Sequence, residues 1–489
     1  MYALRILAHS SLAGPPARQE MSAMTRIYAV ALLIFALCVA VPAVAAPRAE
    51  EQAMPQAIAP GATNPEFMGM VVRDPFYEFN TNPAFPNQPN QAAQDTMGRL
   101  LANIGVRWVR LEFIADPDGH VNFGKYDYFI GTVAPRYGLK VLGLLTTNSI
   151  ITFKDGGYYP YRLNLDPPTL THPTFGGGLN QYMIDWLSEA LRVAEHYNGS
   201  NSAAGRVHAF EIFNEMNRLF GDGTNLPTGI DYAGLNPVYV ARIHTKFYRI
   251  CKNTDNSQPS VICPADTQII LGGLHPKGTS NRRSSSKVAE TFAYTDEQYL
   301  KVMYDNAFTE FKNYAQNLQP WNGTYPLEGV GFHPYPEEIT PRTQGIYNDI
   351  DVKIAPRLNQ LRAVLAAKND QGKPFWITEI GYNIAFYKNR GPYAPSVQAD
   401  FMREVYTSLA ARGDVANVFW FKYEDFPPAD GPDAQMWGIV RIPFAAGPCE
   451  GGVCYAPDGT PQLYRPAYLA YRELAGLPIT RTYVPVAMR

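Results

Sequence analysis

The sequence carries little excess charge and lacks recognisable metal-binding motifs. Its 489 residues have a formal net charge of −2, and only 18% of them are charged. A chain with so small an excess of one sign does not produce the field that attracts nucleic acids or anionic membranes. The spacing of its Cys and His residues does not resemble a zinc site. We therefore expect no nucleic-acid partner, no metal and no other cofactor.

Further absences narrow the class of protein. After the N-terminal region, no apolar run is long enough to span a bilayer. No Gly-rich phosphate-binding loop follows an early strand, which disfavours an open doubly wound sheet. The chain also lacks internal repeats and low-complexity linkers. Its hydrophobic content of 46% is typical of globular proteins, and we expect a monomer with one large domain.

The N-terminal region has the features of an export signal. Arg26 precedes an apolar run over residues 27–44, and Ala43-Val44-Ala45 has the small-residue pattern of a cleavage site. Residues 1–45 are therefore predicted to be a signal peptide, with residues 1–20 as an upstream extension if translation starts at an internal Met. Cleavage is favoured over retention as a membrane anchor. We expect a periplasmic or secreted protein without stable membrane insertion.

The cysteines support the same compartment. Of five, Cys38 lies within the predicted signal peptide, which leaves an even number in the exported chain. An even count in an exported protein predicts disulfides, although some thiols could remain reduced. Proximity in the sequence favours the pairs Cys251–Cys263 and Cys449–Cys454.

Beyond residue 60, short apolar runs alternate with longer segments of helical periodicity. Eight runs are candidate strands: Phe67–Val72, Val106–Phe113, Lys140–Leu145, Val207–Phe213, Gln268–Gly272, Gly329–Phe332, Pro374–Thr378 and Asn417–Phe421. Helical patterns between and after them include residues 179–191, 354–365, 397–409 and 464–474. Eight strands that alternate with helices predict an α/β fold of the (β/α)₈ TIM-barrel type.

We expect the barrel over residues 65–478, a short linker over 46–64 and a C-terminal tail over 479–489. The remaining length falls in loops that follow strands, at residues 80–94, 146–178, 381–396 and 423–462. In a TIM barrel these loops lie on the catalytic face, and loops of such length are uncommon unless they are functional. They are predicted to form the walls of a groove.

Two of the predicted strands end in a glutamate. The segment Phe210–Asn217 reads F-E-I-F-N-E-M-N and contains Glu215, while Pro374–Gly381 contains Glu379. These are the fourth and seventh strands, so the two carboxylates should face each other across the barrel mouth. Opposed carboxylates suit glycosidic cleavage, in which one protonates the leaving oxygen and the other attacks the anomeric carbon. In retaining enzymes the two groups are about 5–5.5 Å apart.

The segment Phe210–Asn217 resembles the W-E-x-W-N-E-P-N motif of glycoside hydrolase clan A, most of all family 39, with family 5 as second choice. The resemblance implies that Glu215 is the acid/base, with Asn214 beside it, and that Glu379 is the nucleophile. The departures from the motif remove no catalytic group and fall at Phe210, Phe213 and Met216.

Other segments agree with this resemblance in their order along the chain. Arg110 resembles the clan's second-strand Arg, which hydrogen-bonds the nucleophile and would keep it ionised. His333 and Tyr335 resemble its His-x-Tyr segment, in which Tyr orients the nucleophile and His can bind substrate. Trp420, on the eighth strand, matches the aromatic platform beneath the sugar.

Several residues near strand ends have weaker cases. Glu211 shares strand parity with Glu215 and is predicted to support the site. For Glu112, Asn148 and His172, substrate contact and a structural role are equally open. Tyr382 and Asn383 are candidates for a sugar subsite, and Glu424 and Asp425 are predicted to be charges at the rim. Three histidines are expected to be structural: His208, His244 and His275.

These features favour a retaining hydrolase of β-glycosidic bonds. The long loops favour endo action on a cell-surface or extracellular polysaccharide. An exo-acting β-xylosidase-like enzyme is the near alternative, and a transglycosylase would share every catalytic residue. A non-catalytic polysaccharide-binding barrel that acts in glycan export is a further alternative, but it predicts the loss of a catalytic Glu.

Overall fold

The computed structural model describes fifteen stretches of the chain: residues 64–72, 81–82, 85–150, 153–154, 157–158, 162–217, 235–254, 259–276, 295–305, 311, 325–335, 354–384, 395–426, 436–446 and 453–479. The predicted signal peptide, most of the linker, most of the C-terminal tail and Cys449 lie outside the described residues. Within the stretches described, no helix combines the length and apolar character needed to cross a membrane.

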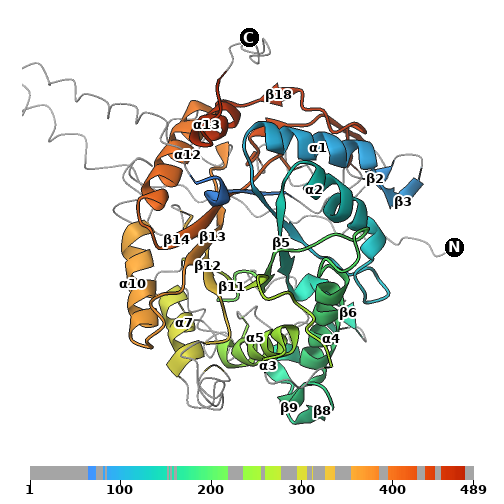
Figure 1. Ribbon diagram of the computed structural model, residues 1–489, viewed down its shortest axis with the longest axis vertical. Helices are drawn as coiled ribbons and strands as arrows, with labels where there is room; N and C mark the ends of the chain where they lie inside the picture. The colour runs from blue at the N-terminus through green and yellow to red at the C-terminus, as the bar shows by residue number, and fades with distance from the viewer. Residues whose placement is uncertain are drawn as a thin grey trace, which may run out of the picture. The chain divides into compact units, whose positions relative to one another are not determined.

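Eight parallel strands close into a barrel, as predicted (Figure 1). In their order around the barrel they are β1 (Met68–Val71), β4 (Trp108–Glu112), β5 (Lys140–Leu145), β10 (Ala209–Ile212), β11 (Gln268–Leu274), β12 (Gly329–Phe332), β13 (Phe375–Ile380) and β14 (Val415–Trp420). Each coincides with a predicted strand, and β14 pairs with β1 to complete the closure. The protein is a (β/α)₈ TIM barrel.

Helices surround the barrel (Figure 1). The longer ones are α1 (Gln91–Asn103), α4 (Gln181–His196), α5 (Pro237–Lys252), α7 (Asp296–Asp305), α10 (Ala355–Ala366), α12 (Pro395–Ala410) and α13 (Pro466–Leu474). Three of them are preceded by an N-cap Asn whose side-chain oxygen accepts a hydrogen bond from a backbone N–H of the first turn. Because the first N–H groups of a helix lack partners within it, these Asn residues determine where α1, α4 and α5 start.

Shorter elements lie mainly in the segments that follow barrel strands. They include two short helices, α2 (Ala134–Arg136) and α3 (Arg162–Leu165), and the strand pairs β2 (Thr81–Asn82) with β3 (Phe85–Pro89), β6 (Phe153–Lys154) with β7 (Gly157–Tyr158), β8 (Leu170–His172) with β9 (Gly176–Leu179), β15 (Val440–Arg441) with β18 (Leu463–Tyr464), and β16 (Phe444–Ala446) with β17 (Val453–Tyr455). The predicted Cys251–Cys263 disulfide is present and links the end of α5 to the segment before β11.

The interior of the barrel is filled near its N-terminal end by an apolar cluster, which we call the plug. Its members are Val71, Trp108, Leu142, Ala209, Ile270, Trp376 and Phe419. Side chains of a barrel strand alternate between the interior and the helices, so the residues two positions further along also face inward. On β4, β10 and β13 these are Arg110, Glu211 and Thr378. The next interior layer, toward the C-terminal ends of the strands, is therefore polar.

Candidate active site

Arg110 is the centre of this polar layer. Its Nε lies 2.5 Å from Glu211 Oε2, its Nη1 2.7 Å from Glu379 Oε1 and its Nη2 2.8 Å from Asn214 Oδ1. Burial opposes the charged form of this side chain, which is 3% exposed, but the two carboxylates outweigh that effect and hold the pKa of Arg110 above its ordinary value. One guanidinium thus connects β4, β10 and β13 and compensates two buried carboxylates.

Glu379 faces the barrel mouth although strand parity alone would turn it outward, since its neighbour Thr378 faces inward. The pairing of β13 with β14 shifts register between Ile377 and Ile380, and such irregularities re-aim side chains. Both carboxylate oxygens of Glu379 accept hydrogen bonds, Oε1 from Arg110 and Oε2 from the Tyr335 hydroxyl at 3.0 Å. These donors hold the carboxylate in one orientation.

Glu215 follows β10 in a tight, unusual turn. Both Phe213 and Glu215 have left-handed backbones, with φ of 64° and 44°, and such strain in residues other than Gly or Asn is concentrated at functional sites. The backbone N–H of Glu215 donates to the Gly273 carbonyl at 2.9 Å. Asn217 exchanges two hydrogen bonds with the His275 backbone, at 2.8 and 2.9 Å. The turn is therefore attached to the end of β11.

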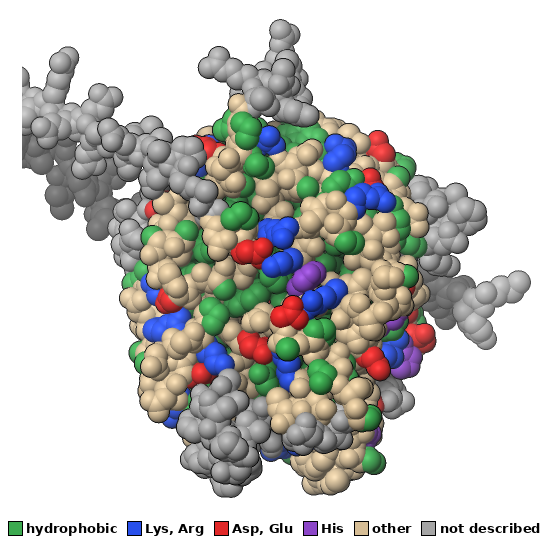
Figure 2. Space-filling model, viewed as in Figure 1, with side chains coloured by type: hydrophobic (Ala, Val, Ile, Leu, Met, Phe, Trp, Pro, Cys, Tyr) green, Lys and Arg blue, Asp and Glu red, His purple; other side chains and the backbone are tan. Residues whose placement is uncertain are grey.

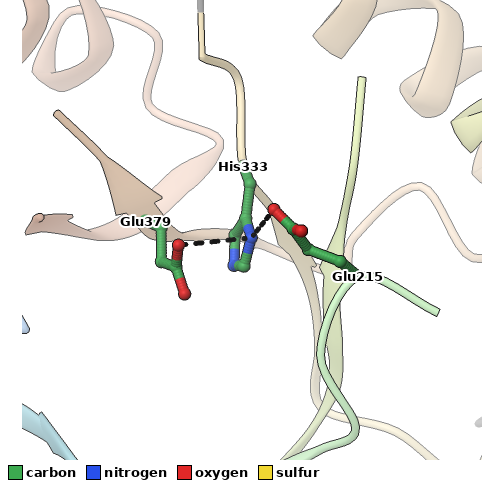
Figure 3. Close-up of side chains that lie close together, drawn as sticks. All are labelled: Glu215, His333 and Glu379. Atoms are coloured by element: carbon green, nitrogen blue, oxygen red, sulfur yellow. Dashed lines mark hydrogen bonds and ion pairs between the residues drawn. The ribbon is translucent and has the colours of Figure 1, made fainter. Parts of the chain in front are cut away.

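His333 lies between the two glutamates (Figure 3). Its Nδ1 is 3.2 Å from Glu215 Oε1 and 3.8 Å from Glu379 Oε2, while Nε2 is 2.9 Å from Thr378 Oγ1. One carboxylate oxygen of Glu215 and one of Glu379 lie within 4.8 Å of one another. The structure thus brings together the two carboxylates that the sequence predicted to face each other.

Glu211 lies beneath the other two glutamates and is 0% exposed. Its Oε1 accepts from the Gly273 N–H and from the Thr378 hydroxyl, both at 2.9 Å, and its Oε2 contacts Arg110. Each carboxylate oxygen is thus occupied by donors of the protein. This position suits the supporting role that the sequence suggested, because it leaves Glu211 no access to the open mouth.

Two features of the site were missed at the level of sequence. Thr378 was assigned no role, Gly272 was considered only as the last residue of a predicted strand, and Gly273 was not considered. A Cβ on Gly273 would lie 1.9 Å from His333 Nε2, and one on Gly272 would lie 1.9 Å from the Phe213 carbonyl oxygen. Only glycine at these positions leaves room for the imidazole ring and for the turn before Glu215. Two adjacent glycines at the end of a predicted strand were the available signal.

The prediction that Trp420 forms an aromatic platform is wrong. Its side chain is fully buried and packs against Phe401 of α12, on the outer side of the barrel. Phe419 belongs to the plug, so parity turns Trp420 outward and the next residue, Phe421, inward. Phe421 packs against Tyr335 and Trp437, with ring centroids 6.3 and 5.4 Å away. The aromatic surface beside the nucleophile is made by these three residues.

Other candidates also lie away from the mouth. Tyr382 is buried and packs against Phe401, as Trp420 does. Its proposed contact with substrate is therefore not supported. Glu424 and Asp425, predicted at the rim, are buried in ion pairs with Lys422 at 2.9 Å and Arg465 at 2.7 Å. Both rim predictions are wrong.

The remaining candidates near strand ends are placed as follows. Asn148 is exposed after β5 and donates to Glu112 Oε1 at 3.1 Å, and the same oxygen also accepts from the Thr146 hydroxyl. Asn383 is buried, and the His172 ring stacks on Phe175 in the β8–β9 hairpin. His244 and His275 are buried in the fold, where a structural role is the simplest interpretation.

Glu215, His333 and Glu379 are also close enough together to offer three ligand atoms to a cation. The chemistry of the donor set disfavours one. Arg110 already contacts Glu379 at 2.7 Å, and a divalent ion beside it would meet a buried like charge. Two opposed carboxylates with one compensating guanidinium instead suit proton transfer and nucleophilic attack.

No protein-family model matches the chain, and no curated protein matches it. Solved glycoside hydrolases resemble it. A family 39 glycoside hydrolase from Bacteroides cellulosilyticus is 16% identical, with a TM-score of 0.46, and the match covers 86% of this chain and 66% of that one. A GH5_18 protein from Streptomyces cattleya is 13% identical, with 86% and 82% covered and a TM-score of 0.48.

A family 1 β-glucosidase from Thermotoga maritima is 14% identical, with a TM-score of 0.47, and the match covers 85% of this chain and 99% of that one. Likeness at this level assigns neither a family nor an activity. The function is therefore inferred below from the geometry of the site itself.

Proposed function

We propose that the protein is a retaining glycoside hydrolase that cleaves β-glycosidic bonds, with Glu379 as nucleophile and Glu215 as acid/base. The observation that carries the proposal is the distance within 4.8 Å between carboxylate oxygens of the two residues. Retaining enzymes have carboxyl groups about 5–5.5 Å apart, whereas inverting enzymes need roughly 6.5–9.5 Å to admit a water between carboxylate and sugar. The distance supports direct attack by a carboxylate.

The surroundings of the two glutamates support different roles. Glu379 accepts from a guanidinium and a phenol, which stabilise a carboxylate and orient it for attack. Glu215 is 5% exposed and its Oε1 faces an imidazole nitrogen, an environment that can hold a carboxylic acid. Two carboxyl groups with contrasting environments are the pattern expected for an ionised nucleophile and a protonated acid.

In the first step, a Glu379 oxygen attacks the anomeric carbon. The bond from that carbon to the glycosidic oxygen breaks, its electron pair remains on the oxygen, and the proton of Glu215 moves to this oxygen. In the second step, water attacks the anomeric carbon while Glu215 takes its proton, and the Glu379 carboxylate leaves. Both steps invert the carbon, so the product keeps the configuration of the substrate.

The proposed substrate is a polysaccharide outside the cytoplasm, cut within the chain. The segments that follow the barrel strands lie on the same end as the two glutamates, and loops on that end determine what a TIM barrel binds. The exposed Asn148 and its partner Glu112 give this end a polar group for hydroxyl-rich ligands. The Cys251–Cys263 disulfide supports an exported protein, because disulfides persist in oxidising compartments.

The test is hydrolysis of a panel of β-linked polysaccharides and aryl β-glycosides, with product sizes to separate endo from exo action. Proton NMR of the first-formed anomer should show retention, and an inverted product would remove Glu379 from the role of nucleophile. Glycosyl transfer to added sugar acceptors without net hydrolysis would point to a transglycosylase. Binding without cleavage of any substrate would favour the polysaccharide-binding barrel.

Variants separate the two roles. Glu379→Ala with added azide should yield an α-glycosyl azide, because azide attacks from the vacated face. Glu215→Ala should instead yield a β-glycosyl azide and should retain most of its first-step rate on a dinitrophenyl glycoside, whose leaving group needs no proton. Glu189→Gln is the matched control, since Glu189 is also a buried glutamate but lies on α4. This variant should hydrolyse substrates as the wild type does and should yield neither glycosyl azide.

A further inference from the structure

The hydrogen bonds around Thr378 determine which atoms carry protons. Its Oγ1 lies 2.9 Å from Glu211 Oε1 and 2.9 Å from His333 Nε2. A hydroxyl has one hydrogen, and an ionised carboxylate can only accept, so the Thr378 hydroxyl donates to Glu211. The oxygen of Thr378 must then accept from the imidazole. Nε2 of His333 therefore carries a hydrogen.

Three donors surround Glu211, and such surroundings suit a carboxylate. Its Oε2 lies 2.5 Å from Arg110 Nε, and its Oε1 accepts from the Gly273 N–H at 2.9 Å as well as from Thr378. Glu211, Thr378 and His333 are all 0% exposed. Bulk solvent therefore does not compete for these hydrogen bonds, and the donors and acceptors named above determine their direction.

A neutral imidazole with a hydrogen on Nε2 has a lone pair on Nδ1. This lone pair faces Glu215 Oε1 at 3.2 Å. It accepts a hydrogen bond from the protonated acid and repels the ionised carboxylate. Two carboxylates also face the ring, Glu379 at 3.8 Å from Nδ1 and Glu211 at 4.0 Å from Nε2, but both of them are already paired with Arg110.

We propose that Thr378 and Glu211 are positioning residues that hold His333 as the Nε2–H tautomer and thereby keep the acid proton on Glu215 in the free enzyme. The inference rests on the proposed function, since it assigns the means by which the general acid retains its proton. When substrate binds, the glycosidic oxygen replaces Nδ1 as acceptor and receives the proton from Glu215. His333 keeps its own proton throughout.

The same arrangement acts in the second step. After the leaving group departs, ionised Glu215 faces the Nδ1 lone pair, and the repulsion between them favours recovery of a proton from the attacking water. In the alternative tautomer, Nδ1–H would donate to the carboxylate and stabilise its ionised form. Thr378 therefore decides whether His333 favours the protonated or the ionised form of the acid/base.

The test compares Thr378→Val, which removes the hydroxyl at nearly constant shape, with Thr378→Ser, which restores it. The alkaline limb of the pH profile of kcat/KM reports loss of the essential acid's proton in the free enzyme. In Thr378→Val this limb should move to lower pH by about 0.5–1 unit, since that is the scale of one hydrogen bond. Thr378→Ser should keep the wild-type limb. Thr245→Val, a buried threonine of α5, is the matched control and should also keep it.

A second measurement needs no activity. The ¹⁵N shifts of the His333 ring, assigned by their loss in His333→Gln, should show hydrogen on Nε2 in the wild type and a shift of population toward Nδ1–H in Thr378→Val. An unchanged limb together with unchanged ¹⁵N shifts in Thr378→Val would overturn the inference while the glycosidase activity stands. If the wild type cleaves no glycoside, the proposed function fails, and the ¹⁵N shifts still decide the tautomer.

Discussion

The two halves of the barrel interior are lined by the same strands but by different kinds of side chain. Near the N-terminal end, Trp108 and Trp376 pack edge to face at 5.5 Å within a plug that contains no charged side chain. Two residues further along the same strands, the interior holds Arg110 and Thr378. Apolar burial contributes stability, whereas buried charge costs desolvation energy that the ion pairs only offset. The comparison indicates that one half supplies stability and the other holds the chemistry.

The ion pairs on the outer surface of the N-terminal end are more exposed to water than those at the mouth. Arg107 and Lys140 both contact Glu66, at 3.1 and 2.7 Å, but all three side chains are between 32% and 41% exposed. Figure 2 shows charges of both signs interspersed on the face it views. Water screens ion pairs of this kind. Their distances resemble those of the buried ion pairs of Arg110, but they contribute much less to stability.

The largest effect is expected when the buried guanidinium is removed. Arg110→Met leaves Glu211 and Glu379 buried without their cation, and the free energy of unfolding should fall by about 3–5 kcal/mol. The kcat/KM should fall by about 10²–10³-fold, as when one preorganised donor is lost. Arg107→Met, on the approach to the same strand, is the control and should change stability by less than about 1 kcal/mol. Chemical denaturation and steady-state kinetics check both variants. Equal losses of stability and of kcat/KM in the two variants would contradict the contrast between buried and exposed ion pairs.

A substitution in the plug should separate stability from activity. Trp376→Ala removes a side chain that is 4% exposed, and the resulting cavity should lower the free energy of unfolding by about 3–5 kcal/mol. Well below the melting temperature, kcat per folded molecule should stay within about twofold, since Trp108 and Phe419, the rings that Trp376 packs against, both belong to the plug. A large loss of kcat at unchanged stability would show that the two halves are not independent.

The sequence was sufficient for the barrel and for its two opposed glutamates. All eight strands were predicted, because buried parallel strands are continuous apolar runs between helical segments. Glu215 and Glu379 followed from their positions at strand ends. The sequence could not show that His333 would contact both Thr378 and Glu215, because these three side chains come from three different strands and meet only when the barrel closes.

Side-chain alternation accounts for the error at Trp420, and its interruption accounts for the position of Glu379. Trp420 was assigned to the mouth by resemblance, yet side-chain alternation on β14 turns Phe421 inward and Trp420 toward α12. Glu379, by contrast, reaches the mouth only because a register shift interrupts the alternation on β13. Bulges depend on the pairing of neighbouring strands, so a single-strand pattern predicts neither where they occur nor which side chain they re-aim.

An intermediate effect is expected at the glycine that makes room for His333. In Gly273→Ala the new methyl would overlap the imidazole, and the displaced ring would lose its contacts with Glu215 and Thr378. Stability should fall by about 1–3 kcal/mol, as in other overpacked interiors. The fall in kcat/KM, expressed as a free energy, should exceed the fall in the free energy of unfolding. Gly372→Ala, where a Cβ would meet nothing within 4 Å, is the matched control and should be neutral in both assays.

The smallest effect concerns the pH dependence of stability at the N-terminal end. Burial, with the nearby charges of Arg206 and Lys140, lowers the pKa of His208 to about 4, below its ordinary value of 6.5. Between these values the unfolded chain binds a proton that the folded protein does not, so stability should fall as the pH drops from about 6.5 to 4.

Because His208 is partly exposed, we expect its share of that loss to be only about 1 kcal/mol. His208→Gln should therefore lose less stability than the wild type between pH 7 and pH 4.5 in thermal melts. Its kcat/KM profile with pH should be unchanged, since His208 lies at the opposite end of the barrel from the glutamates. A moved activity profile would mean that charge at the N-terminal end reaches the mouth through the plug, and the division between the two halves would then fail.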